Sequence, residues 1–220
     1  MKTPYTHICV VLDRSGSMES IREDTIGGFN AFVEQQKLAP GTATLSLIQF
    51  DTQGPFEVVL SFVPIREVPE LTRRRFVPRG GTPLLDAVGR SINATEEGIV
   101  KMPEHQRPQT VIIAIVTDGQ ENSSREFKSS DIQLMIKAKE SLLHWQFVFL
   151  SADLSAVSEA VESGIRPSRT MAFDKTPHGT GRAWATLSGK ISDVRSGTSS
   201  EIDFTEDSSE DSTGDAPKKP

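Results

Sequence analysis

Apolar residues gather in short runs that are separated by longer stretches of mixed character. In two of these runs, residues 8–12 and 111–116, every position is apolar. A run that is apolar on both alternating faces is typical of a strand buried on both sides of a parallel sheet. The pattern predicts strands at residues 7–13, 43–50, 56–63, 110–117, 146–152 and 169–173.

Between most of these runs, apolar residues recur at helical spacing. The two clearest sets are Ile21, Thr25, Phe29, Phe32 and Val33, and Ile132, Met135, Ile136, Ala138 and Leu142. We interpret both sets as helix faces that pack on the core. A final helix is predicted over residues 176–195, with Trp184, Leu187 and Ile191 facing inward.

Strands that alternate with helices predict an α/β fold, a Rossmann-like doubly wound sheet of six mostly parallel strands with helices on both faces. The second and third predicted strands are the exception, because only residues 51–55 separate them. A parallel crossover needs a dozen or more residues, so these two strands should form a hairpin with one antiparallel strand at the edge of the sheet.

Composition and charge narrow the class of protein. The chain of 220 residues is 36% hydrophobic and 25% charged, which is ordinary for a globular protein. Of the net charge of −6, residues 201–220 account for −5, because they hold seven acidic and two basic residues. The nearly neutral remainder argues against nucleic-acid binding. Because no leader and no membrane-spanning run is evident, we expect a cytoplasmic protein without a membrane partner.

Oxygen-bearing side chains follow several of the predicted strands. Asp13, Ser15 and Ser17 come directly after the first strand, Asp118 follows the fourth, and Thr82 lies after two glycines at the start of a helix. The carboxyl ends of neighbouring parallel strands meet at one edge of a sheet. Oxygen ligands without thiol or imidazole favour magnesium, calcium or manganese over zinc or copper.

This three-part pattern resembles the metal-ion-dependent adhesion site of the von Willebrand factor type A (VWA) family, which uses Asp-x-Ser-x-Ser, a distant Thr and a distant Asp. The resemblance covers residues 5–195, and residues 24–30 and 117–126 are most similar to the stand-alone bacterial and phage versions. It implies a sheet with the strand order 3-2-1-4-5-6. Residues 196–220 would then form a disordered acidic tail.

The resemblance also implies roles for the five residues. In the family, Ser15 and Ser17 would contact the ion directly, Thr82 directly or through water, and Asp13 and Asp118 often through water. The implied cofactor is Mg2+, with Mn2+ or Ca2+ as alternatives. A carboxylate from a protein partner, an Asp or a Glu, would fill the open coordination position. The expected function is metal-dependent protein–protein interaction without catalysis.

Other interpretations of the same residues remain open. Each could be a helix cap or a turn residue on its own. Asp13 at a strand end also fits a magnesium-dependent hydrolase or phosphatase, although the second acid expected two residues later is Ser15. A scaffold with a vestigial metal site is the third hypothesis. Divalent-ion titration separates the scaffold from the binder, and a phosphatase assay separates the enzyme from both.

Several neighbouring segments allow two interpretations each. Glu121 and Asn122 either line the rim of the site or belong to a solvated loop. The arginines at 73–75 and 79 form either a solvated basic face or a collar that attracts acidic partners. The acidic segment 201–207 is either a solvated tail or a self-occluding ligand of the metal.

Overall fold

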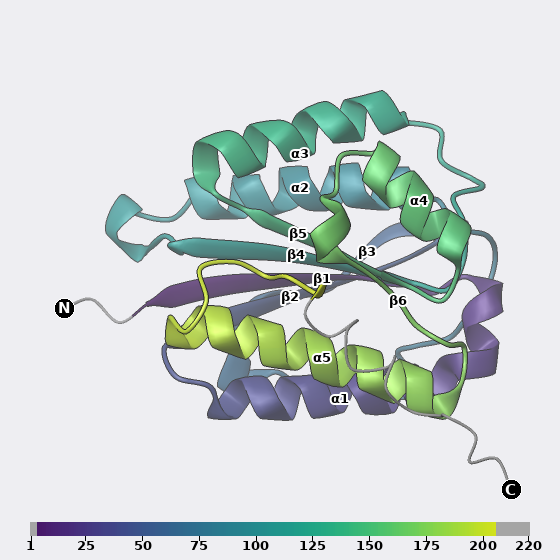
Figure 1. Ribbon diagram of the computed structural model, residues 1–220, viewed down its shortest axis with the longest axis horizontal. Helices are drawn as coiled ribbons and strands as arrows, with labels where there is room; N and C mark the ends of the chain where they lie inside the picture. Colours follow the sequence, from purple (N-terminus) through teal and green to yellow (C-terminus); the bar gives the residue numbers. More distant parts are fainter. Residues whose placement is uncertain (1–3, 206–220) are drawn as a thin grey trace, which may run out of the picture.

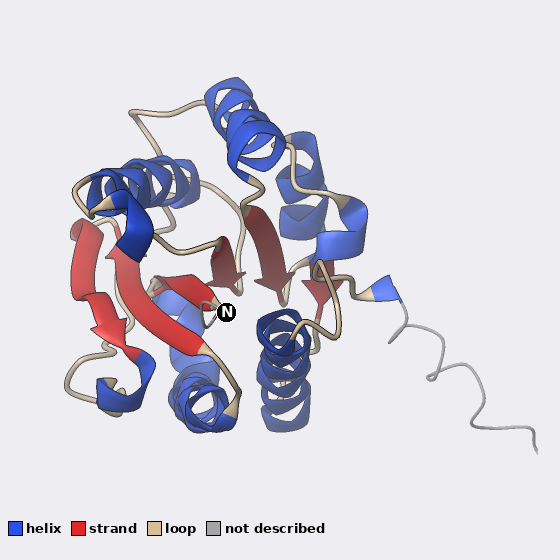
Figure 2. Ribbon diagram, turned by 90° about the vertical axis from the view of Figure 1, so that its left-hand side faces the viewer, coloured by secondary structure: helices blue, strands red, loops and turns tan. Residues whose placement is uncertain are grey.

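The computed structural model describes residues 4–205, which form a six-stranded sheet with helices on both faces (Figures 1 and 2). The strands are β1 (Tyr5–Asp13), β2 (Thr42–Asp51), β3 (Gly54–Pro64), β4 (Thr110–Thr117), β5 (Gln146–Ser151) and β6 (Thr170–Ala172). The helices are α1 (Arg22–Leu38), α2 (Leu84–Val100), α3 (Ser129–Leu143), α4 (Leu154–Glu162) and α5 (Pro177–Ser196). All six predicted strands are present.

The strand order β3-β2-β1-β4-β5-β6 confirms the predicted topology. Strands β2, β1, β4, β5 and β6 run parallel, and β3 pairs with β2 in the antiparallel direction. The hairpin forms because β2 ends at Asp51 and β3 begins at Gly54, so the connection is too short to cross the sheet.

The fully apolar run of β1 is explained by two cores, one on each face of the sheet. Ile8, Val10 and Leu12 point into a cluster with residues of α1 and α5, whereas Cys9 and Val11 point into a cluster with residues of α2, α3 and α4. Figure 1 shows the same division, with α1 and α5 on one face and the other three helices on the opposite face. A strand in this position must be apolar at both alternating faces.

Helices α1 and α5 pack closely through one glycine. A Cβ on Gly28 would lie 2.2 Å from Cδ1 of Trp184, so only glycine leaves room for the indole. The Trp184 ring contacts Phe29 and Phe32, with ring centroids 5.9 and 5.8 Å apart. These contacts confirm the inward position predicted for Trp184, which is buried with Leu187.

The chain after α5 differs from the expected disordered tail. Residues 199–205, which we call the strap, return to the sheet. Ile202 and Phe204 are buried in the core cluster that also contains residues of α1 and α5. The Ile202 amide donates to Gln146 Oε1 (2.8 Å) and the Phe204 amide donates to the Ser168 carbonyl (2.8 Å). Glu201 of this acidic segment also pairs with Arg166 (3.0 Å) and Arg169 (2.9 Å). Residues 206–220 of the expected tail lie outside the described residues.

The strap lies at the amino edge of the sheet. Gln146 begins β5 and Ser168 precedes β6, whereas the predicted metal ligands follow the carboxyl ends of β1 and β4. Self-occlusion of the site by residues 201–205 is therefore wrong for this structure, because their contacts hold them at the opposite edge. None of the helices in the described range 4–205 is both long and apolar enough to cross a membrane.

Candidate metal centre

The carboxylate of Asp13 ends β1 and is held from two sides. Its Oδ1 accepts a hydrogen bond from the Ser15 amide (2.6 Å), and its Oδ2 accepts one from the Thr117 hydroxyl at the end of β4 (2.5 Å). Burial raises the pKa of Asp13 to about 7, although the hydrogen bonds from Thr117 and Ser15 act in the opposite direction; the nearby charge of Asp118 raises the pKa further. A cation at this site would favour the ionised carboxylate.

The other predicted ligands gather at the same edge. The hydroxyls of Ser15 and Ser17 are hydrogen-bonded to each other (3.0 Å), and Ser17 donates to Asp118 Oδ1 (2.6 Å). A Cβ placed on Gly119 would lie 3.6 Å from Ser17 Oγ and 3.9 Å from Thr82 Oγ1, so both hydroxyls face the turn after Asp118. The structure therefore brings the side chains of all five predicted residues together.

The Asp118 carboxylate has one oxygen whose environment is unusual. Its side chain is fully buried, and the partner of Oδ2 among the described residues is a cation. The ammonium group of Lys175, from the loop between β6 and α5, forms an ion pair with this oxygen. A buried carboxylate oxygen that attracts a cation fits a site for a positively charged ligand.

The donor chemistry also limits which ion would fit. No group of three or more His, Cys, Asp and Glu side chains between residues 4 and 205 is arranged to hold a metal ion. An ion at this edge would therefore depend on the hydroxyls of Ser15, Ser17 and Thr82 as well as on carboxylates. Hydroxyl and carboxylate oxygens are ligands for hard divalent cations such as magnesium.

A buried acid that the sequence analysis missed holds two of the site's loops. Asp51, at the end of β2, accepts hydrogen bonds through Oδ2 from Arg14 Nε (2.8 Å) and Arg79 Nε (3.1 Å). Burial alone would raise the pKa of Asp51, but hydrogen bonds from Arg14 and from the Gly54 and Gln53 amides outweigh it and the pKa is lowered. The signal was available, because Asp51 follows a buried strand at the same edge as Asp13.

Backbone hydrogen bonds also join the loop after β1 to the loop that carries Thr82. The Gly16 amide donates to the Gly80 carbonyl (3.0 Å), and the Arg79 amide donates to the Arg14 carbonyl (2.9 Å). Gly80 has a φ of +65°, and a Cβ there would lie 2.3 Å from the Thr52 hydroxyl. The glycine is therefore required for the loop that carries Thr82 to approach the serine loop.

Glu121 and Asn122 accept hydrogen bonds from the backbone around Thr82. Neither the rim nor the solvated-loop interpretation predicted this role. The Thr82 amide donates to Asn122 Oδ1 (2.9 Å), and the Leu85 amide donates to Glu121 Oε2 (2.9 Å). Asp86 in α2 then accepts three backbone amides from residues 125–127, each at 2.9 Å. The loop after β4 is therefore fastened to the start of α2.

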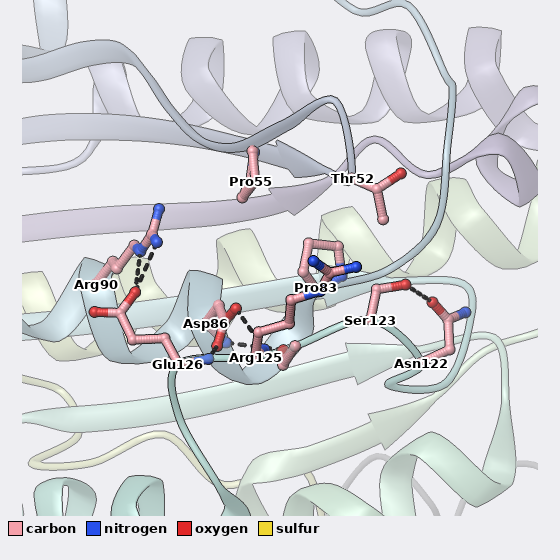
Figure 3. A pocket seen from close by; sticks show the side chains of 10 residues that line it. Thr52, Pro55, Pro83, Asp86, Arg90, Asn122, Ser123, Arg125 and Glu126 are labelled. Carbon is pink, nitrogen blue, oxygen red and sulfur yellow. Dashed lines mark hydrogen bonds and ion pairs between the residues drawn. The ribbon is translucent and has the colours of Figure 1, made fainter.

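A cleft of about 600 Å³ opens beside this loop (Figure 3). Its lining includes Thr52, Asn122 and Arg125, together with Arg90, which pairs with Glu126 (2.6 Å). The cleft adjoins the loop that carries Thr82, because two of its lining residues, Thr52 and Asn122, accept hydrogen bonds from the Gly81 and Thr82 amides.

The contacts bear on the two interpretations of the arginines at 73–75 and 79. Arg79 is occupied by Asp51, and Arg73 pairs with Glu23 of α1 (2.6 Å). These two arginines therefore have structural partners of their own. Arg74 and Arg75 are exposed.

Comparison with known proteins gives no match by sequence and clear matches by structure. No protein-family model matches the chain, and no curated protein matches it. Among solved structures, a VWA protein from Catenulispora acidiphila is similar with a TM-score of 0.60 at 11% identity, over 85% of this chain and 42% of that one. Proximal thread matrix protein 1 from the mussel byssus, with a zinc-occupied MIDAS motif, matches with a TM-score of 0.56 at 13% identity, over 86% and 46%.

The SpRpn10 VWA domain matches with a TM-score of 0.53 at 12% identity, over 84% of this chain and 95% of that domain. The chain thus spans less than half of the first two proteins and nearly all of the third. At 11–13% identity, these three likenesses show the fold. The chain has the fold of a von Willebrand factor type A domain.

Proposed function

We propose that this protein is a divalent-metal-dependent protein-interaction module whose metal centre comprises Asp13, Ser15, Ser17, Thr82 and Asp118. The observation that carries the proposal is the convergence of these side chains around Asp118, a buried carboxylate whose Oδ2 is paired, among the described residues, with the Lys175 ammonium group alone. A hard cation explains why three hydroxyls and two carboxylates meet at one edge of the sheet. Helix capping would explain each residue separately but not their convergence.

The five residues would bind the ion in two ways, directly or through water. Ser15 and Ser17 would hold the ion directly, Thr82 directly or through water, and Asp13 and Asp118 through water. A bound Mg2+ would supply one open coordination position with unneutralised positive charge. The chain itself orients the hydroxyls, through the two hydrogen bonds that join Ser15, Ser17 and Asp118.

The chemistry of the partner follows from this charge. Hydroxyls neutralise little of a divalent ion's charge, so an anionic ligand is favoured at the open position. We therefore propose that the partner is a protein that supplies an Asp or Glu side chain. The cleft lined by Thr52, Asn122 and Arg125 adjoins the loop that carries Thr82 and would offer room for further residues of the partner.

Two observations weigh against the enzyme hypothesis. A phosphatase of the type considered above needs a second acid two residues after the first, and Ser15 stands there with its hydroxyl bonded to Ser17. The buried acids nearest the site also have structural roles, because Asp51 holds Arg14 and Asp86 holds the loop after β4. Interaction through the ion remains the function that the geometry supports best.

Calorimetric titration with magnesium and manganese tests the proposal. We expect saturable binding by the wild type, loss of binding in Asp118→Ala and in the double variant Ser15→Ala with Ser17→Ala, and wild-type binding in the control Ser20→Ala. Ser20 is exposed in the same segment and bonds only the Ser17 carbonyl among the contacts described. Circular dichroism verifies that each variant is folded. Equal binding by wild type and Asp118→Ala would refute the assignment.

Partner capture then tests the interaction. The wild type is immobilised and exposed to native lysate with magnesium, and again with a chelator. Proteins that bind only with magnesium, and that Asp118→Ala fails to retain, are the expected result. Capture that is the same with chelator would refute a metal-dependent interaction.

A further inference from the structure

Lys175 brings a positive charge to the candidate metal centre from an element outside the three loops. It lies between β6 and α5, far from Asp118 in the sequence, and its ammonium group pairs with the buried Asp118 Oδ2. The Lys175 side chain is 37% exposed, whereas the Asp118 side chain is 0% exposed. The lysine therefore reaches from the surface into the site.

The loop that carries Lys175 is anchored on both sides. Before it, Phe173 is buried and its amide donates to the Ser151 carbonyl at the end of β5 (3.0 Å). After it, the Thr176 hydroxyl accepts the Gly179 amide (3.0 Å) and caps α5. With both neighbours fixed, the lysine stem starts from a defined position beside the end of β4.

The backbone around this loop is also tightly packed. A Cβ on Gly179 would lie 2.2 Å from the Asp174 carbonyl oxygen, and the Thr176 amide donates to that same oxygen (2.7 Å). Only glycine allows the first turn of α5 to fold back over Asp174. The backbone on both sides of Lys175 is thus held in place, and this fixes the point from which its side chain reaches Asp118.

We propose that Lys175 is an internal counter-cation that competes with the divalent ion for Asp118 and thereby sets the metal affinity of the site. The inference rests on the proposed function and deepens it. An ammonium group and a divalent ion at one carboxylate repel each other, because both carry positive charge. Metal binding must therefore displace the ammonium group from Asp118, and the loss of that ion pair weakens metal binding.

Reciprocity follows from linkage. If the lysine weakens metal binding, a bound metal must release the lysine by the same factor. The released ammonium group stays tethered beside the metal centre, because Phe173 and Thr176 hold its loop. It is then placed to pair with the carboxylate that a partner brings. Lys175 would in this way oppose the metal when the partner is absent and assist the partner once the metal is bound.

The test compares magnesium affinity by calorimetry in wild type, Lys175→Met and Lys175→Arg. We expect Lys175→Met to bind about tenfold more tightly, which corresponds to about 1.4 kcal/mol, and Lys175→Arg to bind like the wild type because it keeps the charge. The control is Lys101→Met, which changes the net charge equally but removes an exposed lysine that pairs with Glu97 in α2. Its affinity should not change.

A second measurement does not depend on metal affinity alone. Without metal, Lys175→Met leaves the buried Asp118 without its counter-charge, so the melting temperature should fall below that of wild type. The double variant Lys175→Met with Asp118→Asn removes both charges and should recover it. With saturating magnesium, the melting temperature of Lys175→Met should rise by more than that of wild type.

The outcomes separate this inference from the proposed function. Tighter binding by Lys175→Met, or binding by Lys175→Met alone, supports the counter-cation. Equal or weaker binding by Lys175→Met overturns it and leaves the metal-dependent module in place. Failure of both wild type and Lys175→Met to bind any divalent ion overturns both proposals.

Discussion

Removal of the apolar side chains of the strap should show whether this acidic segment is a structural part of the domain. The changes are Ile202→Ala, Phe204→Ala and the double variant. Ile202 is 0% exposed and Phe204 is 4% exposed. Truncating such residues in a rigid core costs about 2–5 kcal/mol for Ile and about 3–5 kcal/mol for Phe.

The strap follows the last helix, so it can detach from the core as a unit, and its docking energy limits the expected loss. Burial of the two side chains contributes about 3–6 kcal/mol at about 1.5–3 kcal/mol each. Ordering the seven residues 199–205 costs about 7 kcal/mol at the low end of the backbone entropy scale. Hydrogen bonds through Ser200, Ile202 and Phe204 return about 3 kcal/mol. The half-exposed Glu201 also pairs with Arg166 and Arg169, at about 0–1 kcal/mol for each pair. Docking is therefore favourable by no more than about 4 kcal/mol.

A small docking energy makes the two substitutions non-additive. Either variant should release the whole strap, so each lowers the free energy of unfolding by the docking energy, at most about 4 kcal/mol, and the double variant by less than about 1 kcal/mol more. Urea unfolding measures these values, and Leu154→Ala, at a residue 73% exposed, is a control that should change stability by less than about 0.5 kcal/mol.

Hydrogen exchange supplies an independent check, because the Ile202 and Phe204 amides donate to acceptors in the domain. Both amides should exchange faster in either single variant. Losses in the double variant that equal the sum of the two single losses would refute release of the strap as a unit. Losses below about 0.5 kcal/mol in both single variants would refute docking itself.

Two further predictions concern the folded domain. Gly27→Ala should raise the free energy of unfolding by about 0.5–1 kcal/mol, because nothing lies within 4 Å of a Cβ there and alanine favours the helix. Gly28→Ala should lower the free energy of unfolding by about 1–3 kcal/mol, because its Cβ would clash with Trp184. Urea unfolding measures both changes, and two changes of the same sign would contradict the packing of α1 on α5. Burial lowers the pKa of His7 from 6.5 to about 3, so the unfolded chain takes up the proton first as the pH falls. Below pH 6.5 this proton uptake lowers the free energy of unfolding, by about 2 kcal/mol at pH 5. His7→Gln should lose this part of the pH dependence, and an unchanged difference in stability between pH 7.5 and pH 5 would show that His7 is not buried as a neutral group.

The sheet was predictable because its signals are local. Runs such as residues 111–116 are apolar at every position only when both faces of a strand are buried, and the short link between β2 and β3 excludes a crossover. The candidate ligands were predictable for the same reason, since Asp13 and Asp118 follow two such strands. Their convergence is confirmed by the structure, whereas their binding of a metal stays a prediction.

The supports of the site were harder to predict because their partners are distant in the sequence. Asp51 acts through Arg14 and Arg79, and nothing local indicates that pairing. Lys175 is one of many lysines in the sequence, and only the fold brings it to Asp118. Residues 201–205 were misinterpreted because their acidic composition outweighed Ile202 and Phe204, whose burial depends on a surface formed by other parts of the chain.

The position of Asp13 on β1 has a mechanical consequence. β1 is hydrogen-bonded along its length to parallel strands on both sides, from Tyr5 to Asp13 against β2 and from Thr6 to Leu12 against β4. A load applied between the carboxyl edge and the amino end of β1 acts along the strand axis, so the bonds of both ladders are strained together in shear. The edge strand β3 can be peeled away one bond at a time. The candidate metal centre is therefore attached to the strand that a lengthwise pull extracts with most difficulty.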